Sequence, residues 1–285
     1  MGEAEVRALQ GYIFADLSSW WKFLVTGSDA RTWLDDLVTN RVDDIGVLRS
    51  RRTLLLSRTG HVRADVHVLG TREGLLLVQD PVQPAPIRDL LEPYVLSSDV
   101  EIVDRTADYG LLAHPTASGG HVVMLPAWTP SVAGYGHGLD LLFPADQLEQ
   151  RRRGHGHWLE ADEADLEVWR IRRGAPRFGV DFGEDTLPGE ARLDELVDRT
   201  KGCFLGQEVV AKVANLGHPP RLFVSFTSGI GLVPGDPVLS DGREAGRVTS
   251  VAPEGDGFAV IARIRWDAAG GRSLETAAGD VLNPR

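Results

Sequence analysis

The sequence changes character after Gly217, and this change limits the folds open to the chain. Pro219 and Pro220 follow almost at once, and the remaining residues form short apolar runs separated by glycine and proline. Asp241-Gly242 between two such runs is typical of a two-residue hairpin turn. Residues 218–285 are therefore predicted to form a small all-β module. Its predicted strands are residues 222–227, 237–239, 247–251 and 258–265.

The preceding part of the chain mixes strand-like and helix-like runs without a regular alternation of one strand and one helix. A doubly wound parallel sheet requires such alternation, so the pattern favours an α+β fold. The clearest strand is 61–69, where valine and alanine at even positions from 62 to 68 alternate with polar residues at odd positions from 61 to 67. With residues 53–57 it predicts a hairpin that turns near Gly60. Further predicted strands are residues 75–78, 100–103, 109–113, 121–125 and 138–143.

Helices are predicted where apolar residues recur every three or four positions. Ser28 is the expected N-cap of a helix that carries Trp33 and Leu34 on its apolar side. A glycine at position 217 is expected to end the last helix. The other predicted helices are residues 87–94, 144–153, 162–173 and 207–216.

Composition excludes several classes of protein. The 285 residues are 42% hydrophobic and 25% charged, as in ordinary globular proteins, and the net charge of −11 argues against a dedicated nucleic-acid binder. A single cysteine excludes an internal disulfide and a four-cysteine iron–sulfur site. Neither a signal peptide nor a long apolar run is found, so we expect a cytoplasmic protein. His155 and His157 lack further metal-ligating neighbours and predict no metal site.

A chemically reactive site is indicated by the segment Lys201-Gly202-Cys203-Phe204-Leu205-Gly206-Gln207-Glu208. It contains the only cysteine and one of only three lysines in the chain. Cys203 is predicted to precede a helix N-terminus and to lie beside Lys201, and both features favour a reactive thiolate. Gly202 and Gly206 allow a sharp turn or a close approach of a ligand to the backbone. The alternative is a buried, purely structural cysteine.

This octapeptide resembles the signature of the YgfZ family of folate-binding proteins, which are related to the T protein of the glycine cleavage system. The family pattern is Lys-Gly-Cys-aromatic-x-Gly-Gln-Glu, and every position matches. Four further blocks resemble the family in the expected order: residues 23–45, 54–68, 171–190 and 234–252. The resemblance implies three lobes around a folate cavity, the last of them a small β-barrel. We place the lobes at residues 1–108, 109–217 and 218–285.

The resemblance also implies a ligand and its contacts. Tetrahydrofolate or a one-carbon derivative is the expected ligand, and Trp20 would offer an aromatic platform for the pterin ring. Asp140 aligns with an acidic residue that holds the pterin in T proteins. The remaining candidate contacts are Arg63, Asp65, Gly202, Gly206, Gln207 and Glu208. Trp20 could instead be a core residue, and the polar face of residues 61–67 could simply meet solvent.

The function implied by the family is assistance to the assembly or repair of iron–sulfur clusters, with Cys203 as the functional thiol and Lys201 tuning it. Iron–sulfur enzymes or cluster assembly proteins would be transient partners. T proteins use a catalytic aspartate, but here Asp80 and Asp89 do not have the expected spacing. A tetrahydrofolate-dependent aminomethyltransferase or demethylase acting on a small amine is therefore the second hypothesis. A non-catalytic folate sensor or scaffold is the third.

Overall fold

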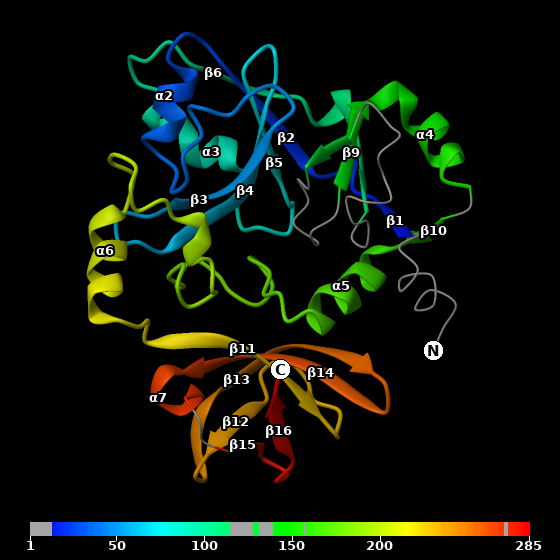
Figure 1. Ribbon diagram of the computed structural model, residues 1–285, viewed down its shortest axis with the longest axis vertical. Coiled ribbons are helices and arrows are strands. Elements are labelled where there is room, and N and C mark those ends of the chain that lie inside the picture. The colour runs from blue at the N-terminus through cyan, green and yellow to red at the C-terminus, as the bar shows by residue number, and fades with distance from the viewer. Residues whose placement is uncertain (1–12, 115–127, 131–138, 157, 271–272) are drawn as a thin grey trace. The chain divides into compact units, whose positions relative to one another are not determined.

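The computed structural model describes residues 13–114, 128–130, 139–156, 158–270 and 273–285 (Figure 1). Contacts divide the chain into two compact units. The first unit contains the residues up to Leu55 together with Ala64–Leu166 and Thr200–Leu205. The second unit contains Leu56–Arg63, Glu167–Arg199 and Gly206–Arg285. The octapeptide 201–208 therefore contributes to both units.

The first sheet has five strands in the order β3-β4-β5-β2-β6. The strands are β2 (Trp21–Thr26), β3 (Ser50–Leu56), β4 (Val62–Gly70), β5 (Leu75–Gln79) and β6 (Glu101–Asp104). The alternation predicted for β4 is confirmed, since Val62, Ala64, Val66 and Val68 are fully buried. Helices α2 (Ala30–Asp35) and α3 (Ile87–Leu91) contribute Leu34 and Ile87 to the core on one face of this sheet.

The second sheet has the order β10-β1-β7-β9-β8 and also belongs to the first unit. Its strands are β1 (Ile13–Asp16), β7 (Tyr109–Ala113), β8 (Trp128–Pro130), β9 (Leu139–Pro144) and β10 (Leu159–Ala161). Only the β1–β10 pair is parallel among the pairs of this sheet in the described chain. Leu76 and Val78 of β5 share a buried cluster with Leu111 and Ala113 of β7. Strand β5 is thus covered on both faces, which explains its uninterrupted apolar sequence.

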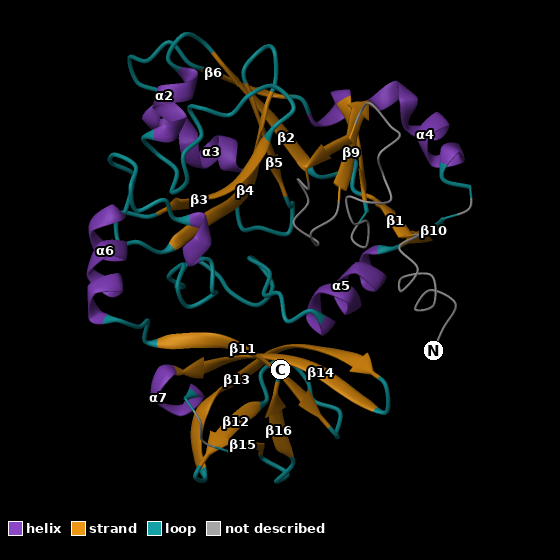
Figure 2. Ribbon diagram, in the orientation of Figure 1, coloured by secondary structure: helices purple, strands orange, loops and turns teal. Residues whose placement is uncertain are grey.

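Residues after Gly217 form a closed barrel with the strand order β11-β14-β13-β12-β15-β16 (Figure 2). The strands are β11 (Arg221–Ser228), β12 (Pro237–Ser240), β13 (Arg243–Glu254), β14 (Gly257–Arg265), β15 (Leu274–Thr276) and β16 (Val281–Pro284). Asp241 and Gly242 both have positive φ, 51° and 73°, as a type I′ hairpin turn requires. The α+β class predicted from the sequence is confirmed, and so is the carboxy-terminal β-barrel that the family resemblance implied.

Three more helices were expected near their observed positions. These are α4 (Leu148–Gly154), α5 (Glu163–Arg172) and α6 (Gln207–Leu216); a single short turn, α7 (Trp266–Ala269), was not predicted. Gly217 ends α6 in the left-handed conformation with φ 87°, as expected. None of the helices in the described part of the chain combines the length and apolar character needed to cross a membrane.

The prediction that Ser28 caps the first helix is wrong. Helix α2 follows Asp29, and neither residue makes a side-chain cap. The backbone nitrogen and Oγ of Ser28 instead donate to Asp99 Oδ2 at 2.9 and 2.8 Å. A partner 71 residues away competes successfully with the local cap. The predicted strand 121–125 lies outside the described residues.

Candidate functional site

A cavity of about 350 Å³ lies within the first unit. Three segments that are distant in the sequence form its wall: β1 with the turn after it, the turn after β5, and β10 with the start of α5. Trp20 lines the cavity and is 7% exposed. The lining residues are Ala15, Asp16, Leu17, Ser19, Trp20, Asp80, Pro81, Glu160, Ala161, Asp162, Glu163 and Leu166.

Lys22 holds the turn that presents Trp20. Its Nζ donates to the carbonyl oxygens of Ser18 at 2.9 Å and Trp20 at 2.8 Å. The side chain is fully buried, and this desolvation lowers the pKa of Lys22 to about 8, although Asp16 and Asp104 act in the opposite direction. The lysine therefore fixes the backbone between β1 and β2 from inside the protein.

Side-chain amides hold the turn that presents Asp80. Gln79 accepts a hydrogen bond from the backbone nitrogen of Ile87 at 2.6 Å and donates to Gln83 Oε1 at 3.0 Å. Prolines occupy three of the positions from 81 to 86 and cannot donate backbone hydrogen bonds, so these buried amides replace the missing backbone contacts. Asp80 Oδ1 accepts from the backbone nitrogen of Val82 at 3.0 Å, which orients the carboxylate.

Carboxylates dominate the polar part of the cavity wall. They belong to Asp16, Asp80, Glu160, Asp162 and Glu163. Arg152 compensates two of them, with distances of 2.5 Å to Glu160 and 3.8 Å to Asp16. An aromatic wall next to hydrogen-bond acceptors suits a flat ring that carries N–H donors, and it repels anionic groups. No group of three or more metal-ligating side chains occurs among the described residues.

The other residues predicted to contact folate do not line this cavity. Asp65 accepts a two-pronged contact from Arg52, at 2.8 Å from Nε and 2.5 Å from the second guanidinium nitrogen. Its backbone exchanges two hydrogen bonds with the Gln83 amide, at 3.0 and 2.6 Å. Arg63 lies in the second unit and contacts Glu184 at 2.5 Å.

Asp140 is buried in β9 and lies near a pair of histidines. Its Oδ1 accepts from the backbone nitrogen of His114 at 3.4 Å. The Nε2 atoms of His114 and His155 are 3.0 Å apart, and His155 Nδ1 is 2.7 Å from the carbonyl oxygen of Arg151. A carbonyl only accepts, so His155 carries its proton on Nδ1, and His114 donates to it when both rings are neutral.

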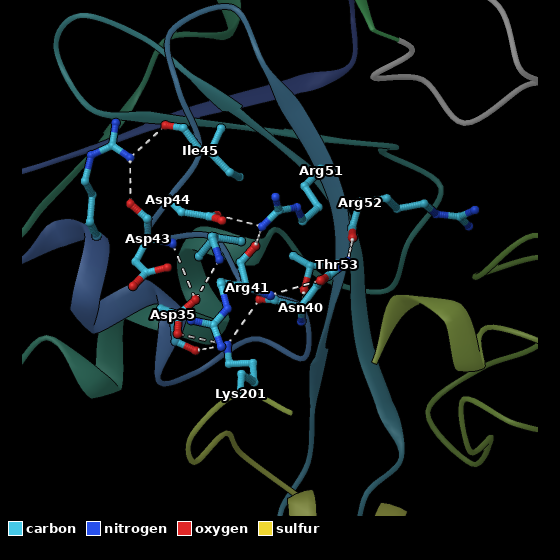
Figure 3. Close-up of polar contacts among 12 residues, drawn as sticks. Asp35, Asn40, Arg41, Asp43, Asp44, Ile45, Arg51, Arg52, Thr53 and Lys201 are labelled. Atoms are coloured by element: carbon cyan, nitrogen blue, oxygen red, sulfur yellow. Dashed lines mark hydrogen bonds and ion pairs between the residues drawn. The ribbon is translucent and has the colours of Figure 1, made fainter. Parts of the chain in front are cut away.

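Lys201 in the octapeptide is buried, and its ammonium contacts the segment 35–40 (Figure 3). Nζ donates to the carbonyl oxygens of Asp35, Val38 at 2.9 Å and Asn40 at 3.1 Å. It also lies 3.2 Å from Asp35 Oδ2. All of these residues belong to the first unit.

The rest of the octapeptide lies partly in the solvent. Cys203 is exposed, as is Gly202. Gly206 has φ 82°, and a Cβ there would lie 2.4 Å from the carbonyl oxygen of Ser57. Gln207 and Glu208 form the first turn of α6, with Glu208 exposed.

Of the ten predicted site residues, the structure places Trp20 alone on the cavity wall in the described chain. Sequence reasoning missed Asp16, Glu160 and Lys22. Lys22 carried a usable signal, because it is one of three lysines and interrupts an apolar run. The carboxylates carried none, since the acidic chain offers 41 such residues.

Comparison with known proteins agrees with this architecture. Residues 2–114 match the family model of the GCVT N-terminal domain. An aminomethyltransferase of Streptomyces avermitilis is 27% identical over 273 residues, which cover 84% of this chain and 73% of the relative. A putative chloroplastic transferase of Arabidopsis thaliana is 22% identical over 95% of this chain and 69% of its own length.

A crystal structure of the glycine cleavage system aminomethyltransferase T from Bartonella henselae has a similar fold, with a TM-score of 0.81. The match covers 98% of this chain and 87% of that structure at 17% sequence identity. The chain therefore has the aminomethyltransferase fold that the sequence resemblance implied.

Proposed function

We propose that this protein is a folate-binding protein of the YgfZ type that assists the assembly or repair of iron–sulfur clusters. Folate binding is supported by one observation above all, which is the cavity lined by Trp20 and carboxylates within an aminomethyltransferase fold. The match of the octapeptide to the YgfZ signature supports the cluster part, together with the exposure of its cysteine.

The donor set of the cavity fits a reduced pterin. Trp20 would stack against the ring, and Asp80, the most buried of the lining carboxylates, would accept hydrogen bonds from the aminopyrimidine edge. The acidic wall disfavours the anionic glutamate tail, so the tail would extend away from it. Tetrahydrofolate supplies a carrier for one-carbon groups when bound.

Cys203 would act as the functional thiol toward transient partners, which are iron–sulfur enzymes or cluster assembly proteins. The chain contains one cysteine and cannot complete a cluster site alone. Contact with a cluster must then be shared with ligands from the partner. An exposed thiol meets that requirement.

Titration of the purified protein with tetrahydrofolate tests the folate site. Trp20→Phe keeps part of the stacking surface and should weaken binding less than Trp20→Ala, for which we expect a loss of about tenfold or more, equivalent to about 1.4 kcal/mol. Trp266→Phe is the matched control, because Trp266 lies in α7 of the second unit and is 40% exposed. Equal affinity of all variants would place folate elsewhere.

Cys203→Ser tests the thiol. We expect reduced activity of iron–sulfur enzymes in cells that carry this variant, with unchanged tetrahydrofolate binding in vitro. Full cluster-enzyme activity in such cells would contradict the role of the thiol and leave the scaffold hypothesis.

A tetrahydrofolate-dependent aminomethyltransferase or demethylase is the second candidate. The similarity to the Streptomyces avermitilis enzyme favours it, and the acidic cavity could accommodate the cationic amine donor. Steady turnover of a methylated small amine with tetrahydrofolate, lost in Asp80→Asn, would support this candidate over the first.

A further inference from the structure

The ammonium group of Lys201 occupies a site built from oxygen atoms. Three are main-chain carbonyl oxygens, of Asp35, Val38 and Asn40, and the fourth is Asp35 Oδ2. The lysine side chain is 1% exposed. Its three N–H groups are therefore all used by the protein.

The local structure explains why the carbonyl oxygen of Asp35 is available. Helix α2 ends at Asp35, and the last carbonyl oxygens of a helix have no partner within it. Asp35 Oδ1 accepts from the backbone nitrogen of Val42 at 2.6 Å, which folds the following turn back toward the helix end. The turn 35–40 thus surrounds a compact cation. The ammonium of lysine suits such a site better than the planar guanidinium of arginine.

We propose that Lys201 is a positioning residue: its ammonium fills a monovalent-cation site formed by the turn 35–40 and thereby holds residues 200–205, including the exposed Cys203, on the first unit. The proposal rests on contacts within one unit and does not depend on folate binding or on the chemistry of Cys203. It gives the lysine of the octapeptide a role distinct from tuning the Cys203 thiol.

One consequence is specific to this geometry. Removing the lysine side chain leaves three carbonyl oxygens and a carboxylate around a site of ammonium size, and backbone carbonyl oxygens bind monovalent cations well. Ammonium or methylammonium should then restore the order of the loop in Lys201→Ala. Choline should not, because it is too large and has no N–H donor.

Hydrogen exchange of the amides in residues 200–205 is the first measurement, and the rate of alkylation of Cys203 at fixed pH is the second. For Lys201→Ala we expect exchange in this segment to rise at least about tenfold, because the loop loses three charge-assisted hydrogen bonds. Ammonium should reverse most of the change. Lys212→Ala is the matched control, because Lys212 is exposed on α6 and should change neither measurement.

Two further variants keep the proposal testable if Lys201→Ala does not fold. Lys201→Met retains the length and apolar contacts of the side chain, and Asp35→Asn retains its shape without the charge; both should loosen the segment 200–205. If hydrogen exchange in residues 200–205 of Lys201→Met equals that of the parent, the proposal is overturned. Apolar packing of the side chain would then be what orders the segment. If Lys201→Ala folds but ammonium does not slow hydrogen exchange in its residues 200–205, the proposal is also overturned.

Discussion

Two glycines of the octapeptide differ in whether the structure could accept a larger residue in their place. Gly206 is left-handed with φ 82°, and a Cβ would meet the carbonyl oxygen of Ser57 at 2.4 Å. Gly202 has open space around the position of a Cβ. The requirement for glycine is therefore steric at the start of α6 and absent four residues earlier.

Gly206→Ala should lower the free energy of unfolding by about 2 kcal/mol or more, from backbone strain and the displaced carbonyl. Gly202→Ala should change it by less than about 0.5 kcal/mol, as expected for an exposed position without strain. Denaturant unfolding of the two variants provides the comparison. Equal losses of stability would contradict the steric explanation.

Lys22 makes stability depend on pH in a direction set by its lowered pKa. The folded state binds this proton with a pKa of about 8 and the unfolded state with the ordinary value of 10.5. Below about pH 8 both states are protonated and the folded state carries the full desolvation cost. Between these values the unfolded state binds more proton, so stability rises with pH.

The free energy of unfolding of the parent should therefore rise by roughly 2–3 kcal/mol more than that of Lys22→Met between about pH 7 and about pH 10. Unfolding curves at several pH values measure the difference. Comparison with the variant removes the contribution of other groups that titrate in this range, such as Tyr109, whose pKa is raised by burial. Parallel profiles would contradict the assignment to Lys22.

Among the elements, the segment after α5 is fixed to the barrel through one carboxylate. Asp181 is buried and accepts hydrogen bonds from Arg170, from the backbone nitrogen of Arg177, and from the hydroxyls of Thr249 and Ser250 at 2.6 Å each. A second contact joins Arg263 of β14 to Glu190 and Asp185. These residues all belong to the second unit.

Asp181→Asn should destabilise this unit by about 3–5 kcal/mol, because it removes the more buried of the two carboxylates that pair with the buried Arg170. Asp267→Asn is the control, since the Asp267–Arg265 pair is exposed and its loss should change the stability little. Thermal unfolding of both variants measures the difference. A small effect of Asp181→Asn would mean that the Glu167 carboxylate, 2.7 Å from Arg170, compensates the charge alone.

For the whole molecule, the net charge of −11 governs which partners can approach. Binding to nucleic acid depends on neutralising phosphates with clustered basic residues, and a negative net charge opposes the approach of phosphates. We expect no complex with tRNA or duplex DNA at micromolar protein and about 0.15 M salt, close to physiological ionic strength. A mobility-shift assay checks this, and a salt-dependent complex would show that a local arginine cluster overrides the net charge.

The sequence by itself determined the features that depend on local periodicity and turn chemistry. Helix 207–216, the alternating strand after Gly60 and the Asp241-Gly242 hairpin follow from spacing and from the residues that turns require. Closure of the carboxy-terminal strands into a barrel was implied only by the family resemblance. Tertiary structure alone decided the pairing of β1 with β7 and β10, and the meeting of Trp20, Asp80 and Glu160 around one cavity. Periodicity tells which face of an element is buried but not which partner covers it. The Lys201 site is the clearest case: Val38 contributes a carbonyl oxygen from 163 residues away, and every residue carries such an oxygen, so no sequence pattern could mark it.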